Sequence, residues 1–245
     1  MRKLSDDNKP NLYFQQIDTG HFEEKQATRD LAPSFPFIIS GGEITEYQYF
    51  LGISKYTTYK FDVNDNYFGL ESKYYDIFPE YIENNILSGN SEALIFCVFD
   101  WDTIYRGQTK REKHEAFLSK IDAIRVKFPN CKIVICPTMP SIEYWFLLHF
   151  TNTDDLFVRC GKVNNRLSPL MKDFCFPNAN ISLGKILKKG EYLSDLLWVQ
   201  KLCADGKLET AIQNAEANIK AAETAGDLDK HSYSYVYQVF KDYPQ

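Results

Sequence analysis

The sequence lacks several features that would point to a metal-stapled, secreted or membrane protein. No Cys-x-x-C pair occurs among its six cysteines, and no cysteine–histidine quartet has zinc-finger spacing. No apolar stretch is long enough to span a bilayer, and the first 16 residues contain no apolar signal core. The formal net charge of −5 gives no global basic signature. We therefore expect a cytoplasmic protein with reduced thiols and no membrane contact, in which a nucleic-acid partner would need a local basic patch.

The residues that are present are those of a folded protein. Hydrophobic residues make up 44% of the 245 residues, with 16 Tyr and 18 Phe, which argues against intrinsic disorder and allows a large core. The pattern along the chain predicts three regions. These are a peripheral N-terminal arm over residues 1–33, an α/β domain over 34–150, and a loop-rich and helical C-terminal region over 151–245.

Short apolar runs alternate with amphipathic stretches through the middle region. Strands are expected at 35–42, 55–63, 94–99 and 132–138. Helices are expected at 43–53, at 70–87 with an interruption at Pro79, at 110–128 and at 140–150. This alternation indicates an α/β fold with a mostly parallel sheet flanked by helices.

The C-terminal third has a different character. Residues 151–182 are expected to be mainly loops, and helices are expected at 208–223 and 232–240. The α/β sheet is therefore expected to carry a helical C-terminal appendage.

Two aspartates follow the most apolar of the expected strands, where the chain reads LIFCVFDWDTIYR from Leu94. A run without a polar side chain indicates a strand buried on both faces. Side chains two apart in an extended segment point the same way, so Asp100 and Asp102 should project together while Trp101 points away. Two such carboxylates repel each other unless a cation or a proton lies between them. A pair that only caps the following loop is the competing interpretation.

Further acidic residues follow the neighbouring strands. Glu43 and Glu46 come after the first strand, and Glu143 comes after the fourth. The carboxyl ends of parallel strands form the ligand crevice of an open sheet, so we expect these acids to converge. Clustered carboxylates suit Mg²⁺ or Mn²⁺, and such a site best serves phosphodiester hydrolysis. The candidate metal ligands are Asp100, Asp102, Glu46 and Glu143, and Glu43 is a further catalytic candidate.

Lysines and arginines are concentrated near these acids. One cluster, just beyond the two aspartates, consists of Arg106, Lys110, Arg111 and Lys113. A second set, in the segment expected to be loops, consists of Arg159, Lys162 and Arg166. Solvated surface charge and contact with a nucleic-acid backbone are the two interpretations of these residues.

Two residues of the helix expected at 140–150 are interpreted as structural or minor. His149 lies in an apolar helix, where a histidine is more often a hydrogen-bonded core residue than a catalyst. Trp145 is expected to pack in the core.

Three stretches resemble a known family. GGEITEYQYF, FDWD and PSIEYWFLLHF, in this order, resemble the RloB-like family, whose pattern runs roughly E-G-x-x-T-E-x-x-Y-F, D-x-D and S-N-P-x-F-E-x-W-x-x-x-H-F. The resemblance covers about residues 35–150, and NAEANIKAAE and SYSYVYQVF resemble the family's C-terminal end. The third motif is the most specific, because matches occur at Pro140, Glu143, Trp145, His149 and Phe150.

The resemblance implies a Toprim-like fold in which a glutamate after the first strand and a D-x-D pair after a later one hold the metal for strand cleavage. It implies a Mg²⁺- or Mn²⁺-dependent nuclease of DNA or RNA in prokaryotic anti-phage defence or abortive infection. It also implies an AAA- or ABC-type ATPase partner encoded nearby, and it leaves the oligomeric state open.

One position departs from the family pattern, because the family's first glutamate aligns with Gly41. Three explanations compete. A neighbouring glutamate reaches the metal, Glu46 is itself the working ligand, or the protein is a catalytically weakened binding module that docks a defence ATPase. The surviving acids favour the first two, since an inactive site has no need of them.

Overall fold

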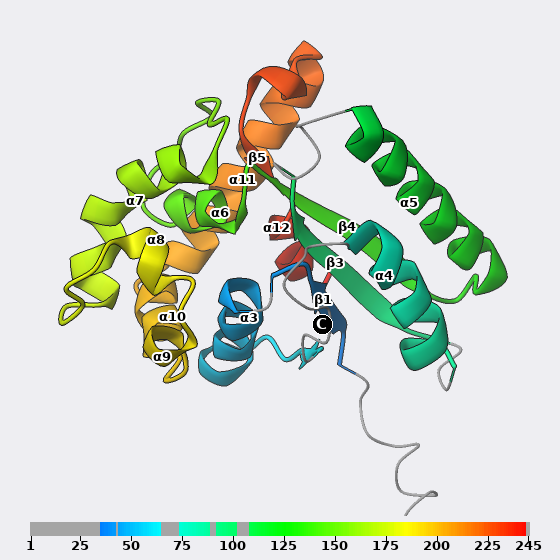
Figure 1. Cartoon of the computed structure of the whole chain (residues 1–245), viewed down its shortest axis with the longest axis horizontal. Coiled ribbons are helices and arrows are strands. Elements are labelled where there is room, and N and C mark those ends of the chain that lie inside the picture. The colour runs from blue at the N-terminus through cyan, green and yellow to red at the C-terminus, as the bar shows by residue number, and fades with distance from the viewer. Residues whose placement is uncertain (1–34, 43, 65–73, 89–91, 102–107, 244–245) are drawn as a thin grey trace, which may run out of the picture. The chain divides into compact units, whose positions relative to one another are not determined.

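The protein is built on one five-stranded sheet with the strand order β2-β1-β3-β4-β5. The computed structural model describes residues 35–42, 44–64, 74–88, 92–101 and 108–243. The strands are β1 (Phe37–Ser40), β2 (Asp62–Val63), β3 (Leu94–Asp100), β4 (Lys132–Met139) and β5 (Tyr233–Ser234). All neighbouring strands pair in parallel except β5, which pairs antiparallel with β4. The predicted mostly parallel α/β sheet is confirmed (Figure 1).

Helices connect the strands and continue after β4. Those between strands are α3 (Thr45–Tyr56), α4 (Tyr74–Tyr81), its π-helical continuation η2 (Ile82–Ile86), and α5 (Gln108–Lys127). Those after β4 are α6 (Ile142–Leu148), α7 (Cys160–Cys175), α8 (Leu183–Ile186), α9 (Gly190–Leu193), α10 (Leu197–Cys203), α11 (Lys207–Ala225), the 3-10 turn η3 (Leu228–Lys230) and α12 (Tyr237–Lys241). The predicted helical C-terminal region is confirmed.

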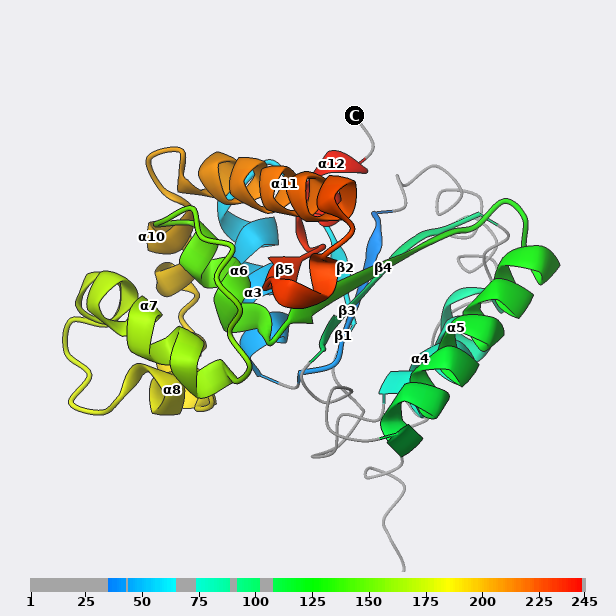
Figure 2. The same cartoon turned by 90° about the horizontal axis from the view of Figure 1, so that it is seen from above.

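Side-chain alternation along β3 separates two hydrophobic cores. Ile95, Cys97 and Phe99 pack with α4, η2 and α5. Phe96 and Val98 pack with the other set of helices, which includes α3, α6 and α11. Figures 1 and 2 show α4 and α5 on one side of the sheet and α3, α6 and α11 on the other. Both faces of β3 are therefore buried, as its apolar sequence predicted.

α5 uses the apolar stripe expected from its spacing. Phe117, Ile121 and Ile124 are buried against the sheet, and Phe128 packs partly on the same core. Pro79 does not interrupt its helix, so that expectation was wrong: it lies inside α4, which continues directly into η2. Proline removes one backbone donor but keeps a helical φ, and the helix carries on past it.

The second strand is shorter than the sequence predicted. Only Asp62 and Val63 belong to β2, while α3 extends to Tyr56. The Thr57 hydroxyl donates a hydrogen bond to the Ile53 carbonyl at 2.8 Å, which satisfies an acceptor at the helix end. Of the strand expected at 55–63, the first residues belong to the end of α3, and only Asp62 and Val63 pair with β1.

The expectation of loops over residues 151–182 was wrong, because α7 occupies residues 160–175. Its buried stripe is Val163, Leu167, Met171 and Cys175, spaced four residues apart. Pro169 lies inside this helix and hid the pattern, because proline is usually a sign of helix termination.

The helix expected at 232–240 begins only at Tyr237, and the strand β5 occupies Tyr233–Ser234, so the first part of that expectation was wrong. β5 precedes α12, and the hydroxyl oxygens of Thr138 and Ser234 lie 2.8 Å apart in a buried position. From Phe35 onward the chain forms one compact unit. The arm predicted over residues 1–33 lies outside the described residues, and the boundary at residues 150 and 151 stays a prediction. In the part of the chain that the structure describes, no helix combines the length and apolarity of a bilayer crossing.

Candidate functional site

The last residue of β3, Asp100, shares a side of the strand with Phe96 and Val98, the side that carries α3 and α6. Its Oδ1 accepts a hydrogen bond from the backbone N–H of Ile142 at 2.9 Å. Trp101 packs on the other side, with ring centroids 6.3 Å from Phe99. The expected divergence of Asp100 and Trp101 is confirmed, and Asp102 lies outside the described residues.

Glu143 follows in the first turn of α6 and is 5% exposed. Its Oε1 accepts a hydrogen bond from the thiol of Cys160 at 3.1 Å. Burial raises the pKa of Cys160, and the charges of Glu143 and Asp100 raise it further. The end of β3, the start of α6 and the start of α7 therefore bring these three side chains together.

Glu46 lies in the first turn of α3 and is also 5% exposed. The start of this helix is tied down by Thr45, whose hydroxyl donates to the carbonyl of Leu187. A Cβ placed on Gly42 would lie only 1.9 Å from Glu46 Oε2, so the carboxylate rests against a backbone that only glycine leaves open. Glu46, one of the candidate metal ligands, is thus buried at the edge of the sheet.

The electrostatics connect two of these acids. Burial raises the pKa of Glu46 to about 7, its own backbone N–H opposes that rise, and the negative charge of Glu143 adds to it. Two buried carboxylates that repel each other are stabilised when a cation or a shared proton lies near them. With a pKa of about 7, Glu46 is therefore only partly ionised at neutral pH.

The donor chemistry suits a hard cation, but the ligand set is incomplete among the described residues. Glu46, Asp100 and Glu143 offer only oxygen donors, which magnesium prefers. In the described ranges, no group of three or more His, Cys, Asp or Glu side chains is arranged to hold a metal ion. Glu43 and Asp102, the other two acids expected here, lie outside those ranges. The structure brings Glu46, Asp100 and Glu143 to one edge of the sheet, and these described acids do not by themselves form a metal site.

Gly41 occupies the position where the family pattern has glutamate. Its N–H donates to the Val98 carbonyl at 2.8 Å, and a Cβ there would lie 3.1 Å from the Cβ of Phe99. The end of β1 thus packs closely on β3, and a larger side chain would require Phe99 to move slightly.

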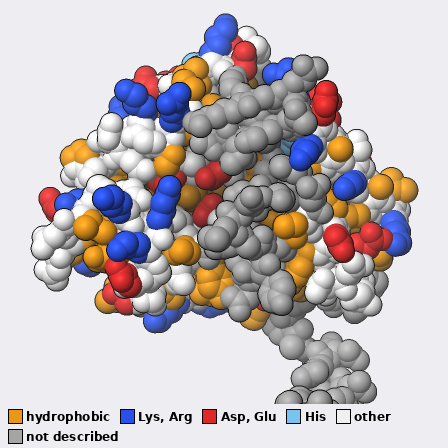
Figure 3. Space-filling view, in the orientation of Figure 1, with side chains coloured by type: hydrophobic (Ala, Val, Ile, Leu, Met, Phe, Trp, Pro, Cys, Tyr) orange, Lys and Arg blue, Asp and Glu red, His pale blue; other side chains and the backbone are white. Residues whose placement is uncertain are grey.

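The basic residues fall on two helices that begin at this edge. Arg111 and Lys113 are exposed near the start of α5, while Arg106 and the side chain of Lys110 lie outside the described residues. Arg159, Lys162 and Arg166 are exposed at the start of α7 and along it, and Arg166 pairs with Asp155. Figure 3 shows Asp and Glu side chains at the centre of this face and Lys and Arg side chains over α7, α8 and α9.

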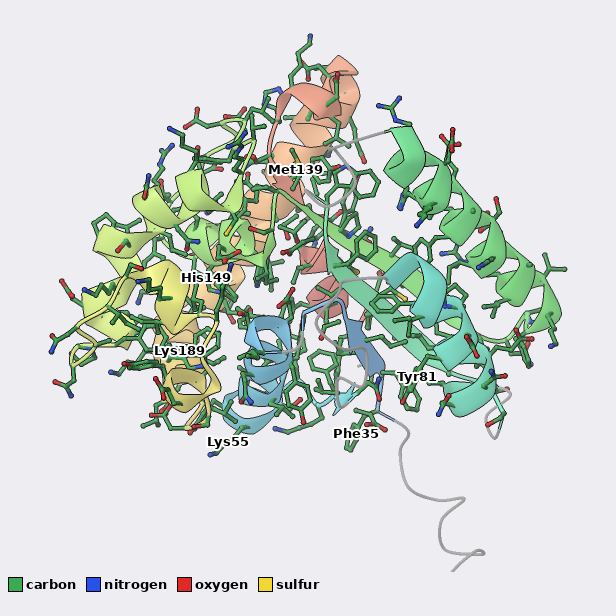
Figure 4. All side chains as sticks on the ribbon, viewed as in Figure 1. Phe35, Lys55, Tyr81, Met139, His149 and Lys189 are labelled. Atoms are coloured by element: carbon green, nitrogen blue, oxygen red, sulfur yellow. The ribbon has the colours of Figure 1, made fainter. Side chains whose placement is uncertain are left out.

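His149 and Trp145 are core residues. His149 Nδ1 lies 3.0 Å from the carbonyl of Trp145, and burial lowers the pKa of His149 to about 3. The indole N–H of Trp145 donates to the hydroxyl of Tyr49 at 2.8 Å. Figure 4 places His149 among the helices on the α3 and α6 side of the sheet. A neutral, buried imidazole fits the packing role expected from the sequence.

Sequence reasoning missed two residues beside the acids. The thiol of Cys160 contacts Glu143, and the side-chain N–H of Asn164 donates to Cys160 Sγ at 3.1 Å. The four-residue spacing of the α7 stripe could have predicted this helix from the sequence. Cys160 and Asn164 would then have been placed one turn apart near its start.

A mostly parallel sheet with buried carboxylates at its carboxyl edge defines an α/β protein with an acidic site. The RloB-like protein family model matches residues 37–242, and the chain therefore belongs to the RloB-like family. The match includes the C-terminal helices as well as the sheet. No curated protein and no solved structure matches the chain.

Proposed function

We propose that the protein is a metal-dependent nuclease that hydrolyses phosphodiester bonds of DNA or RNA in prokaryotic anti-phage defence, acting with an ATPase partner. The observation that supports this most is the burial of Glu46 and Glu143 beside Asp100 at the carboxyl edge of the sheet. Burying carboxylates that repel each other costs free energy, and proteins keep such groups mainly where they function.

Each acid has a role in this proposal. Asp100, Asp102, Glu46 and Glu143 would hold Mg²⁺ or Mn²⁺, which when bound polarises a phosphoryl oxygen and lowers the pKa of water. The Ile142 N–H orients Asp100 by its hydrogen bond at 2.9 Å. With a pKa of about 7, Glu46 can accept or release a proton at its carboxylate near neutral pH.

The basic residues provide the contact with substrate in this proposal. Arg159 and Lys162 flank Cys160 at the start of α7, and Arg111 and Lys113 lie at the start of α5. Such side chains bind phosphates without reading bases. They would lead a nucleic-acid strand past the acids, whether it is DNA or RNA.

The test is cleavage of nucleic acid by the purified full chain, alone and with its ATPase, with and without Mg²⁺ or Mn²⁺. Asp100→Asn keeps the shape and removes the charge, so cleavage should fall by at least about a hundredfold. The matched control is Asp122→Asn, which removes the same charge from the exposed side of α5. Equal cleavage by folded Asp100→Asn and wild-type protein would refute the proposal.

A binding module that docks a defence ATPase is the second candidate. It is favoured by Gly41, which offers no carboxylate, and by the incomplete ligand set among the described residues. A folded protein that cleaves nothing with either metal, with or without the ATPase, and that still binds the ATPase would establish this alternative.

A further inference from the structure

A directed chain of hydrogen bonds leads from α7 into the candidate site. The side-chain N–H of Asn164 donates to Cys160 Sγ at 3.1 Å, and the Cys160 thiol donates to Glu143 Oε1 at 3.1 Å. Asn164 and Cys160 lie one turn apart on α7, while Glu143 belongs to α6. Cys160 both accepts from Asn164 and donates to Glu143, so Glu143 is held by a hydrogen bond from a neighbouring helix.

The state of the thiol agrees with a donor. Burial raises the pKa of Cys160, and the charge of Glu143 raises it further, so sulfur keeps its proton at neutral pH. A protonated thiol is a poor nucleophile. At this position the thiol is a hydrogen-bond donor to Glu143.

We infer that Cys160 is a positioning residue that, itself held by Asn164, fixes the Glu143 carboxylate at the edge of the sheet by a hydrogen bond. The consequence for metal binding depends on the proposed function, whereas the hydrogen bond does not. Without the donor, the buried carboxylate would lose its orientation, and a metal ligand that must first be ordered binds more weakly.

The contact itself is tested without metal or substrate by a double-mutant cycle in a chelator. Cys160→Ala removes the donor, and Glu143→Met removes the acceptor at similar side-chain length. Denaturant unfolding of the wild type, both single variants and the double variant gives the coupling. Cys160→Ala should change the unfolding equilibrium constant about fivefold more when Glu143 is present than when it is absent. Coupling below about twofold would overturn the inference.

The role in the site is tested by titrating the full chain with Mn²⁺ alone in a calorimeter. Cys160→Ala should weaken Mn²⁺ binding about three- to tenfold, and Cys160→Ser, which keeps a donor, should restore most of it. Cys203→Ala is the matched control, because that half-buried thiol lies at the end of α10 and donates to no carboxylate among the described residues.

The outcomes separate the two claims. Equal Mn²⁺ affinity of wild type and Cys160→Ala, or an equal loss in Cys160→Ala and Cys160→Ser, would overturn the positioning role. If the wild type binds no Mn²⁺ while the double-mutant cycle shows coupling, the metal-dependent function fails and the hydrogen bond stands.

Discussion

The two faces of the sheet differ in what they bury. The face covered by α4 and α5 is packed with apolar and aromatic side chains. It buries His114, whose pKa burial lowers to about 4, and the Cys97 thiol, whose pKa burial raises to about 12. The face covered by α3 and α6 buries Glu46 and Glu143 at its edge. At neutral pH the buried imidazole and thiol of the first face are therefore uncharged, whereas Glu46 on the second face, with a pKa of about 7, is partly ionised.

The two faces differ in how their buried ionisable groups affect the free energy of unfolding. A neutral histidine between aromatic rings adds to packing, because Trp101 contacts His114 at a centroid distance of 4.3 Å. Buried carboxylates on the other side subtract from stability unless something binds them. Removing an apolar core side chain on the first face and neutralising a buried carboxylate on the second should therefore have opposite effects on the free energy of unfolding.

The largest effect is expected on the apolar face. Phe117→Ala should lower the free energy of unfolding by about 3–5 kcal/mol, because the ring is fully buried between α5 and the sheet and its loss leaves a cavity. Denaturant unfolding measures the change. The control on the same helix is Val126→Ala, at a side chain that is 83% exposed, with an expected change below about 0.5 kcal/mol. A loss below about 1 kcal/mol for Phe117→Ala would show that this face is loosely packed.

On the face that buries Glu46 and Glu143, a substitution is expected to raise the free energy of unfolding. The folded protein raises the pKa of Glu46 from 4.5 to about 7. The stability from this shift is fully present below pH 4.5 and is lost as pH rises through 7. In metal-free buffer, Glu46→Gln should therefore be more stable than wild type by about 2–3 kcal/mol at pH 8, with the difference vanishing near pH 4.5.

Chemical denaturation across that pH range is the measurement for Glu46→Gln. Its control is Glu83→Gln, at an acid that pairs with Lys127 on the surface. A difference between Glu46→Gln and wild type that does not change with pH would remove Glu46 as the titrating group.

A smaller effect is expected where the two faces meet at the end of β1. Gly41→Glu should lower the free energy of unfolding by about 1–2 kcal/mol, because its Cβ lies 3.1 Å from the Cβ of Phe99. Cleavage should stay level or fall, since a further carboxylate beside Glu46 adds like charge. Thermal unfolding and cleavage are measured together, with Gly41→Ala as the uncharged control. A rise in cleavage in a folded Gly41→Glu protein would show instead that the position restores a missing ligand.

The smallest effect concerns the basic residues on the two sides. Replacing Arg159 and Lys162 by Ser should weaken oligonucleotide binding about equally across sequences and flatten its salt dependence by up to about 0.9 per lost phosphate contact. The same change at Arg111 and Lys113 should have less effect, because α7 contacts the acids through Cys160. Fluorescence anisotropy across salt concentrations compares the pairs, with Lys127→Ser at the far end of α5 as the control. Equal salt slopes for all variants would assign these charges to the solvated surface.

The parts of the fold that were predictable have strong local patterns. β3 and β4 are apolar runs, and the stripe of α5 has helical spacing, so the parallel sheet and its helices followed from the sequence. Glu46 and Glu143 follow β1 and β4, the two strands on either side of β3, and the carboxyl ends of parallel strands lie at one edge of a sheet. Their position at this edge follows from the parallel arrangement of the strands, so it could be predicted without knowledge of side-chain contacts.

The rest depended on contacts that local patterns do not encode. α7 was missed because Pro169 outweighed a buried stripe, and with it the contact of Cys160 with Glu143. β5 has only two residues, and its pairing with β4 is visible only in the folded chain. The Toprim-like and defence interpretations stay predictions, as do the metal and the partner.

The antiparallel strand β5 has a consequence for biosynthesis. Ser234 meets Thr138 across 96 residues of sequence, so Thr138 and Met139 at the end of β4 have no strand beside them on that side until the ribosome has made that further length. At translation rates of about 5–20 residues per second, this interval lasts roughly 5–20 s. An open strand edge is a site where nascent chains associate with one another. A chain stopped before Tyr233 would leave Thr138 and Met139 without the strand that pairs with them.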